Sequence, residues 1–114
     1  PLEVRSFDED VALAEAMHFE AEIFRDAWGV PRVLGETDGD AAFALAYAYA
    51  EDDFATIQYA LRAALGPEML AADESEARGA YLVQALGVTD LVAAEYETQL
   101  TLDTRALLSG YAAG

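Results

Sequence analysis

The sequence contains no cysteine, no lysine and no asparagine, and its only basic side chains are six arginines. Without cysteine the protein has no disulfide bonds, thiolate nucleophiles or zinc–thiolate sites, and the redox compartment stays undetermined. The arginines are scattered along the chain, whereas nucleic-acid binding draws most of its affinity from clustered cations that neutralise phosphates. We therefore expect no direct nucleic-acid binding and, for the same reason, no binding to an anionic membrane surface.

Long hydrophobic runs are also missing. No apolar stretch approaches the roughly 18–20 residues that span a bilayer, and residues 1–5 lack the basic-then-apolar order of a signal peptide. The sequence thus predicts a soluble protein of the cytoplasm, or of the host cytoplasm if it is virus-encoded.

Acidic side chains are present in large excess. The 114 residues include 22 acidic and six basic side chains, which gives a formal net charge of −16. Hydrophobic residues still make up 54% of the chain, so enough apolar surface is available to offset chain entropy. A GC-rich coding sequence or a salt-rich cytoplasm would each produce part of this acidity without any role in binding. The length predicts one domain over residues 1–114.

The apolar periodicity predicts an all-α fold, a compact domain of five or six short helices. Asp8 offers an N-cap for a first helix from Glu9 to Trp28, which Gly29 then ends. The apolar stripe of this predicted helix comprises Leu13, Met17, Ala21, Phe24 and Trp28.

Two short stretches favour extended structure instead. Residues 30–34 follow the predicted helix stop and are expected to be extended. Leu2 and Val4 alternate with polar neighbours, which is compatible with a short N-terminal edge strand.

Residues 41–50 have an ambiguous period. Large apolar residues alternate with alanines as in a strand, but the alanines and a cap at Asp40 favour a nearly buried helix. Asp52 or Asp53 is expected to start a second, amphipathic helix that ends at Gly66-Pro67.

The predicted caps of the remaining helices are Ser75, then Thr89 or Asp90, and finally Asp103.

A metal site has one weak candidate. The only histidine, His18, lies three residues after Glu15 and four before Glu22, so a helix would place all three on one face. Glu-x-x-His is a ligand pattern of carboxylate-bridged iron sites, but no second copy is present. An acidic solvated face that stabilises the imidazolium is the alternative, and we expect no bound metal.

Residues 36–40 resemble the opening of a calcium loop, with carboxylates at alternate positions. The resemblance fails because Ala41 occupies the position that needs glycine and Tyr47 the position that needs a bidentate glutamate. A loop that caps the following helix explains these residues better.

Nucleophilic catalysis lacks its usual parts. The serines lie in no glycine-rich elbow, and no phosphate-binding loop is present. The sequence therefore predicts a protein that is not an enzyme and needs no cofactor.

The leading hypothesis is an acidic interaction protein that binds a protein partner with a basic surface. Such a protein would inhibit or regulate a nucleic-acid-binding protein, as DNA mimics, antitoxins and phage-encoded inhibitors do. Aromatic residues supply candidate contacts, because tyrosine and tryptophan are enriched at binding hot spots. The predicted partner-binding residues are Glu36, Asp38, Asp40, Glu51, Asp52, Asp53, Trp28 and Tyr59.

Two other classes remain open. One is a structural subunit of a viral particle or a larger assembly, including a homo-oligomer, in which aromatic residues form the subunit contacts. The other is a metal-binding helical protein centred on Glu15, His18 and Glu22.

Overall fold

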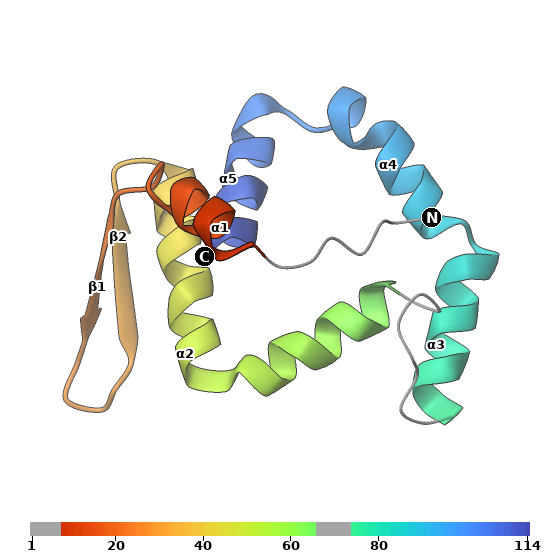
Figure 1. Cartoon of the computed structure of the whole chain (residues 1–114), viewed down its shortest axis with the longest axis horizontal. Coiled ribbons are helices and arrows are strands. Elements are labelled where there is room, and N and C mark those ends of the chain that lie inside the picture. Colours follow the sequence, from red (N-terminus) through yellow and green to blue (C-terminus); the bar gives the residue numbers. More distant parts are fainter. Residues whose placement is uncertain (1–7, 66–73) are drawn as a thin grey trace. The chain divides into compact units, whose positions relative to one another are not determined.

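The computed structural model describes residues 8–65 and 74–114, which form five helices and a two-stranded antiparallel sheet (Figure 1). The helices are α1 (Glu9–Ala16), α2 (Asp38–Leu65), α3 (Glu74–Ala85), α4 (Val88–Gln99) and α5 (Leu102–Ala113). The strands are β1 (Ala21–Arg25) and β2 (Pro31–Gly35). The all-α prediction is therefore wrong, because the chain forms a β-hairpin where a helix was expected.

Helix α1 is much shorter than predicted. Its start is confirmed, since the Asp8 carboxylate accepts hydrogen bonds from the N–H groups of Asp10 and Val11. The helix ends at Ala16, and the chain turns into β1 before the expected end at Trp28. The helical spacing of the apolar residues was misleading here, because Met17 and Trp28 are 85% and 91% exposed.

Hydrogen bonds within the turn stabilise the hairpin. The Asp26 carboxylate accepts hydrogen bonds from the N–H groups of Trp28 and Val30, and Gly29 adopts a φ of 82°. A side-chain acceptor followed by a glycine with positive φ is typical of a tight turn. The extended structure expected near residues 30–34 is confirmed as β2, which pairs with β1 from Ala21↔Gly35 to Arg25↔Pro31.

The chain divides into two compact units, with boundaries at Asp52–Asp53 and Leu100–Thr101. We call the unit with the hairpin, α1, α5 and the first part of α2 the hairpin unit. The other, the helical unit, contains the rest of α2 together with α3 and α4. The sequence-based assignment of one domain to residues 1–114 stays a prediction.

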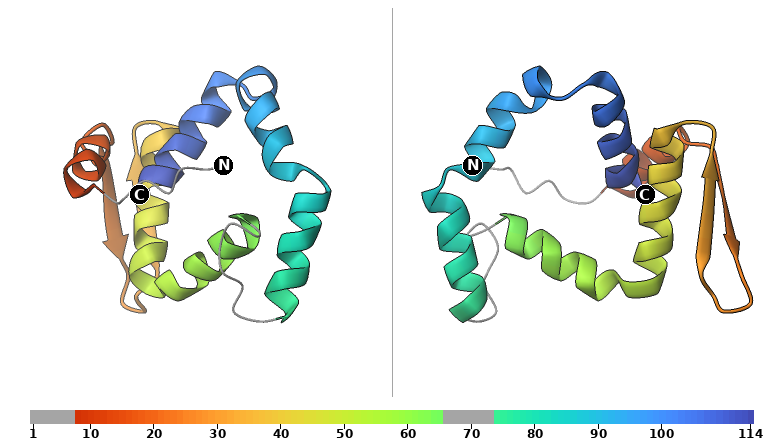
Figure 2. Two further views of the ribbon diagram at one scale, coloured as in Figure 1. Left: turned by 45° about the vertical axis from the view of Figure 1, so that its right-hand side comes forward. Right: turned by 180° about the vertical axis from the view of Figure 1, so that it is seen from behind.

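The first part of α2 lies at the centre of the hairpin unit, beside the hairpin and α5 (Figures 1 and 2). The helix predicted for residues 41–50 is confirmed, and its buried residues are Ala42, Ala44, Ala46 and Ala48. Burial at this spacing needs neighbours on more than one side of the helix. Phe43 stacks on Phe19 at 5.0 Å between ring centroids, and a Cβ atom on Gly110 of α5 would overlap the backbone of Gly39.

The helical unit begins at a kink. Asp53 has non-helical backbone angles (φ −153°, ψ 70°), and its carboxylate accepts hydrogen bonds from the N–H and the hydroxyl of Thr56. Asp53 thus starts the second helical segment, as predicted. Arg78 pairs with Glu74 on α3, and Gly87 (φ 62°) joins α3 to α4.

Four other predicted caps differ from the structure. Asp40, the predicted cap of residues 41–50, lies inside α2, which begins at Asp38. Gly87 is the N-cap of α4 in place of Thr89 or Asp90, and Thr101 caps α5 in place of Asp103. Ser75 lies inside α3, whose first residue is Glu74. Leu2, Val4 and Gly66-Pro67 lie outside the described residues.

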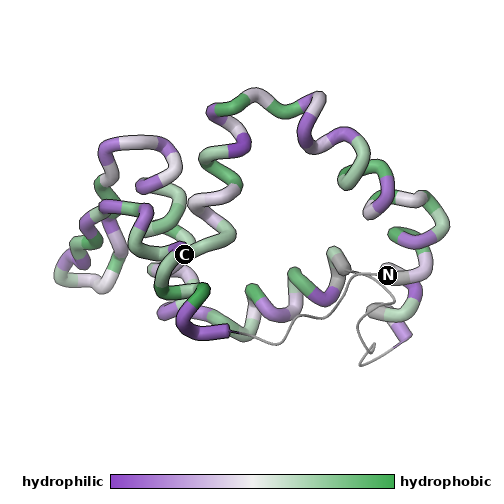
Figure 3. Tube along the Cα trace, turned by 45° about the horizontal axis from the view of Figure 1, so that its top comes forward, coloured by the Kyte–Doolittle hydropathy of each residue, from purple (hydrophilic) through white to green (hydrophobic). Residues whose placement is uncertain are grey.

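Few large side chains are enclosed within the described parts of the chain. Hydrophobic residues occur along every helix (Figure 3), yet the buried hydrophobic residues there are the four alanines of α2. Within residues 8–65 and 74–114, no helix is both long and apolar enough to cross a membrane.

Candidate functional site

Asp40, the most enclosed carboxylate among the described residues, lies where the hairpin meets α2. Asp40 is only 8% exposed, and its Oδ1 accepts a hydrogen bond from the Glu20 N–H at 2.9 Å. Its Oδ2 accepts from the Thr37 hydroxyl at 2.6 Å and from the Thr37 N–H at 3.0 Å, while Thr37 Oγ1 accepts from the Asp40 N–H. This reciprocal pair is a capping box with aspartate at its third helical position.

These hydrogen bonds also set the ionisation of Asp40. The Thr37 hydroxyl and then the Glu20 N–H stabilise the carboxylate, which lowers its pKa below the usual value for aspartate. Asp40 is therefore negatively charged, and its carboxylate links Thr37, just before α2, to Glu20, just before β1.

A second network joins the far end of β1 to α2. Arg25 pairs through Nη2 with Glu51 and through Nη1 with Asp52, each at 3.0 Å, and Nη1 also donates to the Gly29 carbonyl. Hydrogen bonds to Asp52 and Glu51 raise the pKa of the guanidinium. The hairpin is thus attached to α2 near both ends of β1.

Most of the predicted partner-binding acids therefore have contacts inside the protein. Asp53 is engaged by Thr56, whose hydroxyl and N–H lower the pKa of the carboxyl, and Asp40, Glu51 and Asp52 are bound as described above. Glu36 and Asp38 are exposed, with Asp38 in the first turn of α2. Arg25 and Thr37 were not predicted as site residues, although the spacing Thr37-x-x-Asp40 is typical of a helix cap.

The two predicted aromatic contacts lie in different units. Trp28 is in the hairpin turn, and Tyr59 is 57% exposed on the second part of α2. Both rings are accessible, so the structure leaves them available for contact without indicating a partner.

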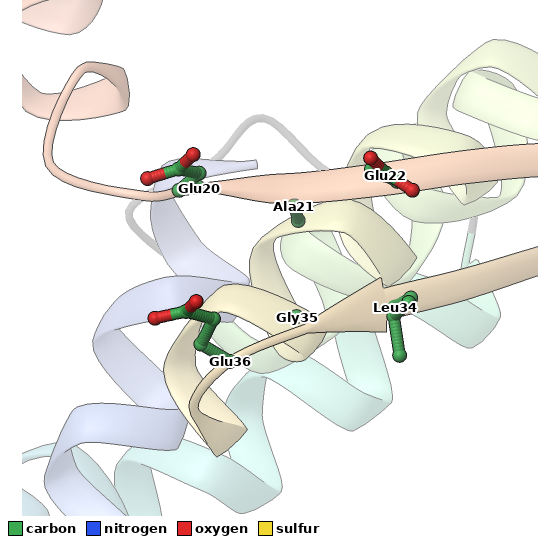
Figure 4. A pocket seen from close by; sticks show the side chains of 6 residues that line it. All are labelled: Glu20, Ala21, Glu22, Leu34, Gly35 and Glu36. Atoms are coloured by element: carbon green, nitrogen blue, oxygen red, sulfur yellow. The ribbon is translucent and has the colours of Figure 1, made fainter.

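Three glutamates line a depression of about 330 Å³ at the open end of the hairpin. Figure 4 shows the Glu20 and Glu36 carboxylates extending to the same side, with Glu22 further along β1. The other lining residues are Ala21, Leu34 and Gly35. The lining supplies carboxylates but no hydroxyl, imidazole or basic side chain to accompany them.

A second depression, of about 360 Å³, lies between α1 and α5. Glu15, His18 and Ser109 all line it, which brings a hydroxyl, an imidazole and a carboxylate to one place. No hydrogen bond joins these side chains within the described structure. The Ser109 hydroxyl therefore has no hydrogen bond to the imidazole of the kind by which a histidine activates a serine nucleophile.

The candidate metal ligands are separated by the fold. Glu15 and His18 line the depression beside α5, whereas Glu22 is on β1 and lines the other one. The helix that would have aligned them ends at Ala16. Among the described residues, no group of three or more His, Cys, Asp or Glu side chains is placed to hold a metal ion.

Comparison with known proteins identifies relatives. Residues 20–114 match the family model described as penicillin amidase. A penicillin acylase 2 proenzyme from Pseudomonas sp. (strain SE83) is 33% identical over 92 residues, which are 79% of this chain and 12% of that protein. The acyl-homoserine lactone acylase PvdQ of Pseudomonas fluorescens (strain Pf0-1) is 31% identical over 111 residues, which are 90% of this chain and 14% of that protein.

The fold is also found in a solved structure. A thermostable penicillin G acylase from Alcaligenes faecalis superposes with a TM-score of 0.62 at 22% identity, covering 82% of this chain and 50% of that chain. At this level of identity the likeness establishes the fold, a mixed α/β domain. The chain spans a small part of the relatives it matches, 12% and 14% of their lengths.

These matches overturn the functional predictions made from composition. The matches are to a family of amidases and acylases, and they contradict the predictions of a non-enzymatic inhibitor, a DNA mimic and a phage protein. The physical reason is that net charge does not show where the charged groups lie in the fold or what they contact. Several carboxylates bind the protein's own N–H groups and an arginine.

Proposed function

The chain belongs to the penicillin amidase family, and from this membership we propose that it forms part of an acylase. The reaction is hydrolysis of an amide: water adds to the acyl carbon, the carbon–nitrogen bond breaks, and a carboxylic acid and an amine are released. The observation that carries the proposal is the family match over residues 20–114, supported by two relatives named as acylases.

The substrate class follows from what those two names share. A penicillin and an acyl-homoserine lactone both carry an acyl group on an amide nitrogen next to a ring. We therefore assign an N-acylated amine as the substrate class.

The role of the chain within the enzyme is to build the framework. His18 and Ser109 line one depression without a hydrogen bond between them, and the acids nearest the hairpin serve as caps and ion-pair partners. The reacting groups then come from the rest of a polypeptide that is several times longer in the relatives.

The test measures hydrolysis of a panel of N-acyl p-nitroanilides by the longer polypeptide that contains this chain. We expect release of p-nitroaniline by that polypeptide and none by the 114-residue chain. The variant His18→Ala/Ser109→Ala of the longer polypeptide should retain the activity.

Two results would contradict the proposal. A folded longer polypeptide that hydrolyses no amide of the panel would refute an acylase function. Hydrolysis by the 114-residue chain that is lost in Ser109→Ala would place the reacting groups within this chain.

A further inference from the structure

The hairpin has two outer edges, and the register shows which backbone groups reach them. The Asp26 N–H donates to the Val30 carbonyl, so the adjacent pair Arg25↔Pro31 is a non-hydrogen-bonded pair. Hydrogen-bonded and non-hydrogen-bonded pairs alternate along an antiparallel ladder, so Phe24↔Arg32 is a hydrogen-bonded pair and the alternation continues to the open end of the hairpin. The residues with outward-facing backbone groups are Ala21, Ile23 and Arg25 on β1, and Pro31, Val33 and Gly35 on β2.

The edge formed by β2 is obstructed at both of its ends. Pro31 has no N–H to offer to another strand. A Cβ atom on Gly35 would come within 2.5 Å of the Ala41 nitrogen, so this end of the strand lies directly against the first turn of α2. Val33 is left as the one outward-facing position of β2 between these two obstructions.

The edge formed by β1 has none of these obstructions. Its outward-facing residues Ala21, Ile23 and Arg25 all have N–H groups, and no other described residue accepts a hydrogen bond from them. The register runs without a bulge and the strand contains no proline; of its two charged side chains, Arg25 is held by Glu51 and Asp52. An edge without a bulge, a proline or a covering element can accept another strand.

One face of the hairpin is also left uncovered by the described chain. Phe24 and Leu34 are 55% and 63% exposed, on the face that carries the hydrogen-bonded pairs. The hairpin is attached to α2 through Asp40 and Arg25, but this attachment leaves the apolar side chains Phe24 and Leu34 exposed. A further strand beside β1 would add apolar contacts on this face.

We propose that the outer edge of β1 pairs with an extended segment from the remainder of the acylase polypeptide, with apolar side chains beside Phe24. This inference rests on the proposed function, because it takes the chain as part of a longer enzyme, of which the relatives' matched regions are 12% and 14%. A strand fits because outward N–H and carbonyl groups recur at every second residue. A second copy of the chain fits poorly, since two chains of net charge −16 repel each other.

Residue-resolved amide hydrogen exchange tests the pairing directly. In the 114-residue chain, the N–H groups of Ala21 and Ile23 should exchange freely while that of Phe24 is retarded by β2. In the longer polypeptide, the N–H groups of Ala21 and Ile23 should exchange at least about tenfold more slowly. This readout does not depend on catalysis, so a polypeptide that shows the protection but no hydrolysis would refute the proposed function alone.

Three outcomes would overturn the inference. Free exchange of Ile23 in the longer polypeptide would mean that the edge stays open. Protection of Ile23 in the monomeric 114-residue chain would mean that this chain covers its own edge. Protection that rises with the concentration of the 114-residue chain would identify a second copy as the partner.

A matched pair of proline variants supplies an independent test. Ile23 and Val33 face each other across the hairpin, are both half-buried, and both direct their N–H outward. Ile23→Pro and Val33→Pro should therefore perturb the 114-residue chain to a similar degree. In the longer polypeptide, Ile23→Pro should lower the yield of folded protein and the Tm more than Val33→Pro. Equal effects there would refute the assignment to the β1 edge.

Discussion

The crossing of α2 and α5 allows a sharp test, because it depends on a missing side chain. Gly110 is buried, and a Cβ atom there would overlap the carbonyl group of Gly39. Backbone atoms cannot rotate away as a side chain can, so the two helices must separate. We therefore expect Gly110→Ala to destabilise the hairpin unit.

The magnitude follows from two opposing effects. Overpacking of a tight contact costs about 1–3 kcal/mol, and the rigid backbone contact puts this crossing near the upper value. Replacing a helical glycine with alanine returns about 1 kcal/mol of helix propensity. The free energy of unfolding should thus fall by about 2 kcal/mol, which lowers the Tm by roughly 10 °C for a unit of this size.

Gly79 provides the control within the same chain. It also lies inside a helix, but a Cβ atom added there has no neighbour within 4 Å. Gly79→Ala should therefore stabilise the helical unit by about 1 kcal/mol. Urea unfolding followed by circular dichroism at neutral pH measures both variants. A neutral or stabilising Gly110→Ala would refute the close crossing of α2 and α5.

Three further changes test the caps and networks. Thr101→Ala removes the acceptor of the Thr104 N–H and should cost about 1 kcal/mol in urea unfolding, whereas an unchanged midpoint would contradict its role as N-cap. Arg25→Gln should speed amide exchange in β1 at low salt and change it less at about 1 M salt, because screening already weakens these exposed pairs; an effect equal at both salt concentrations would argue against an ionic origin. Because the folded pKa of Asp40 is lowered, its contribution is present above the unfolded pKa and is lost as pH falls through the folded value. Thr37→Val raises that folded pKa, so its acid unfolding should begin at a higher pH than in the parent, and coincident curves would count against the hydrogen bond.

The start of a helix could be predicted from the sequence where one short polar side chain caps it. Asp8 and Asp53 each precede a helical segment and accept N–H groups from its first turn, as expected. Residues 41–50 were correctly assigned to a helix because alanine strongly favours helix over strand. These successes depend on interactions within a few residues.

The hairpin was misassigned because two periods coincide in the same residues. Ala21, Phe24 and Trp28 continue the three-and-four spacing of α1, while the side chains of β1 also alternate between the two faces of the sheet. The deciding signal was the turn. The Asp26 carboxylate accepts hydrogen bonds from backbone N–H groups there, and Gly29 adopts a positive φ. Contacts with α2 through Arg25 and Asp40 then favour the hairpin, and such contacts between distant residues are not visible in a local pattern.

The acidity of the chain was interpreted as a partner-binding feature because a net charge does not show where the acidic side chains lie in the fold. Several carboxylates have a structural role within the fold. Asp8, Asp26 and Asp53 each accept backbone N–H groups, and the more buried Asp40 does so with a lowered pKa. Glu51 and Asp52 hold Arg25. A carboxylate that is already hydrogen-bonded must give up those bonds before it can bind a cationic surface, which reduces any gain from the new contact. Net charge can therefore point to a partner only after the acids that hold the fold together have been set aside, and only the folded chain identifies them.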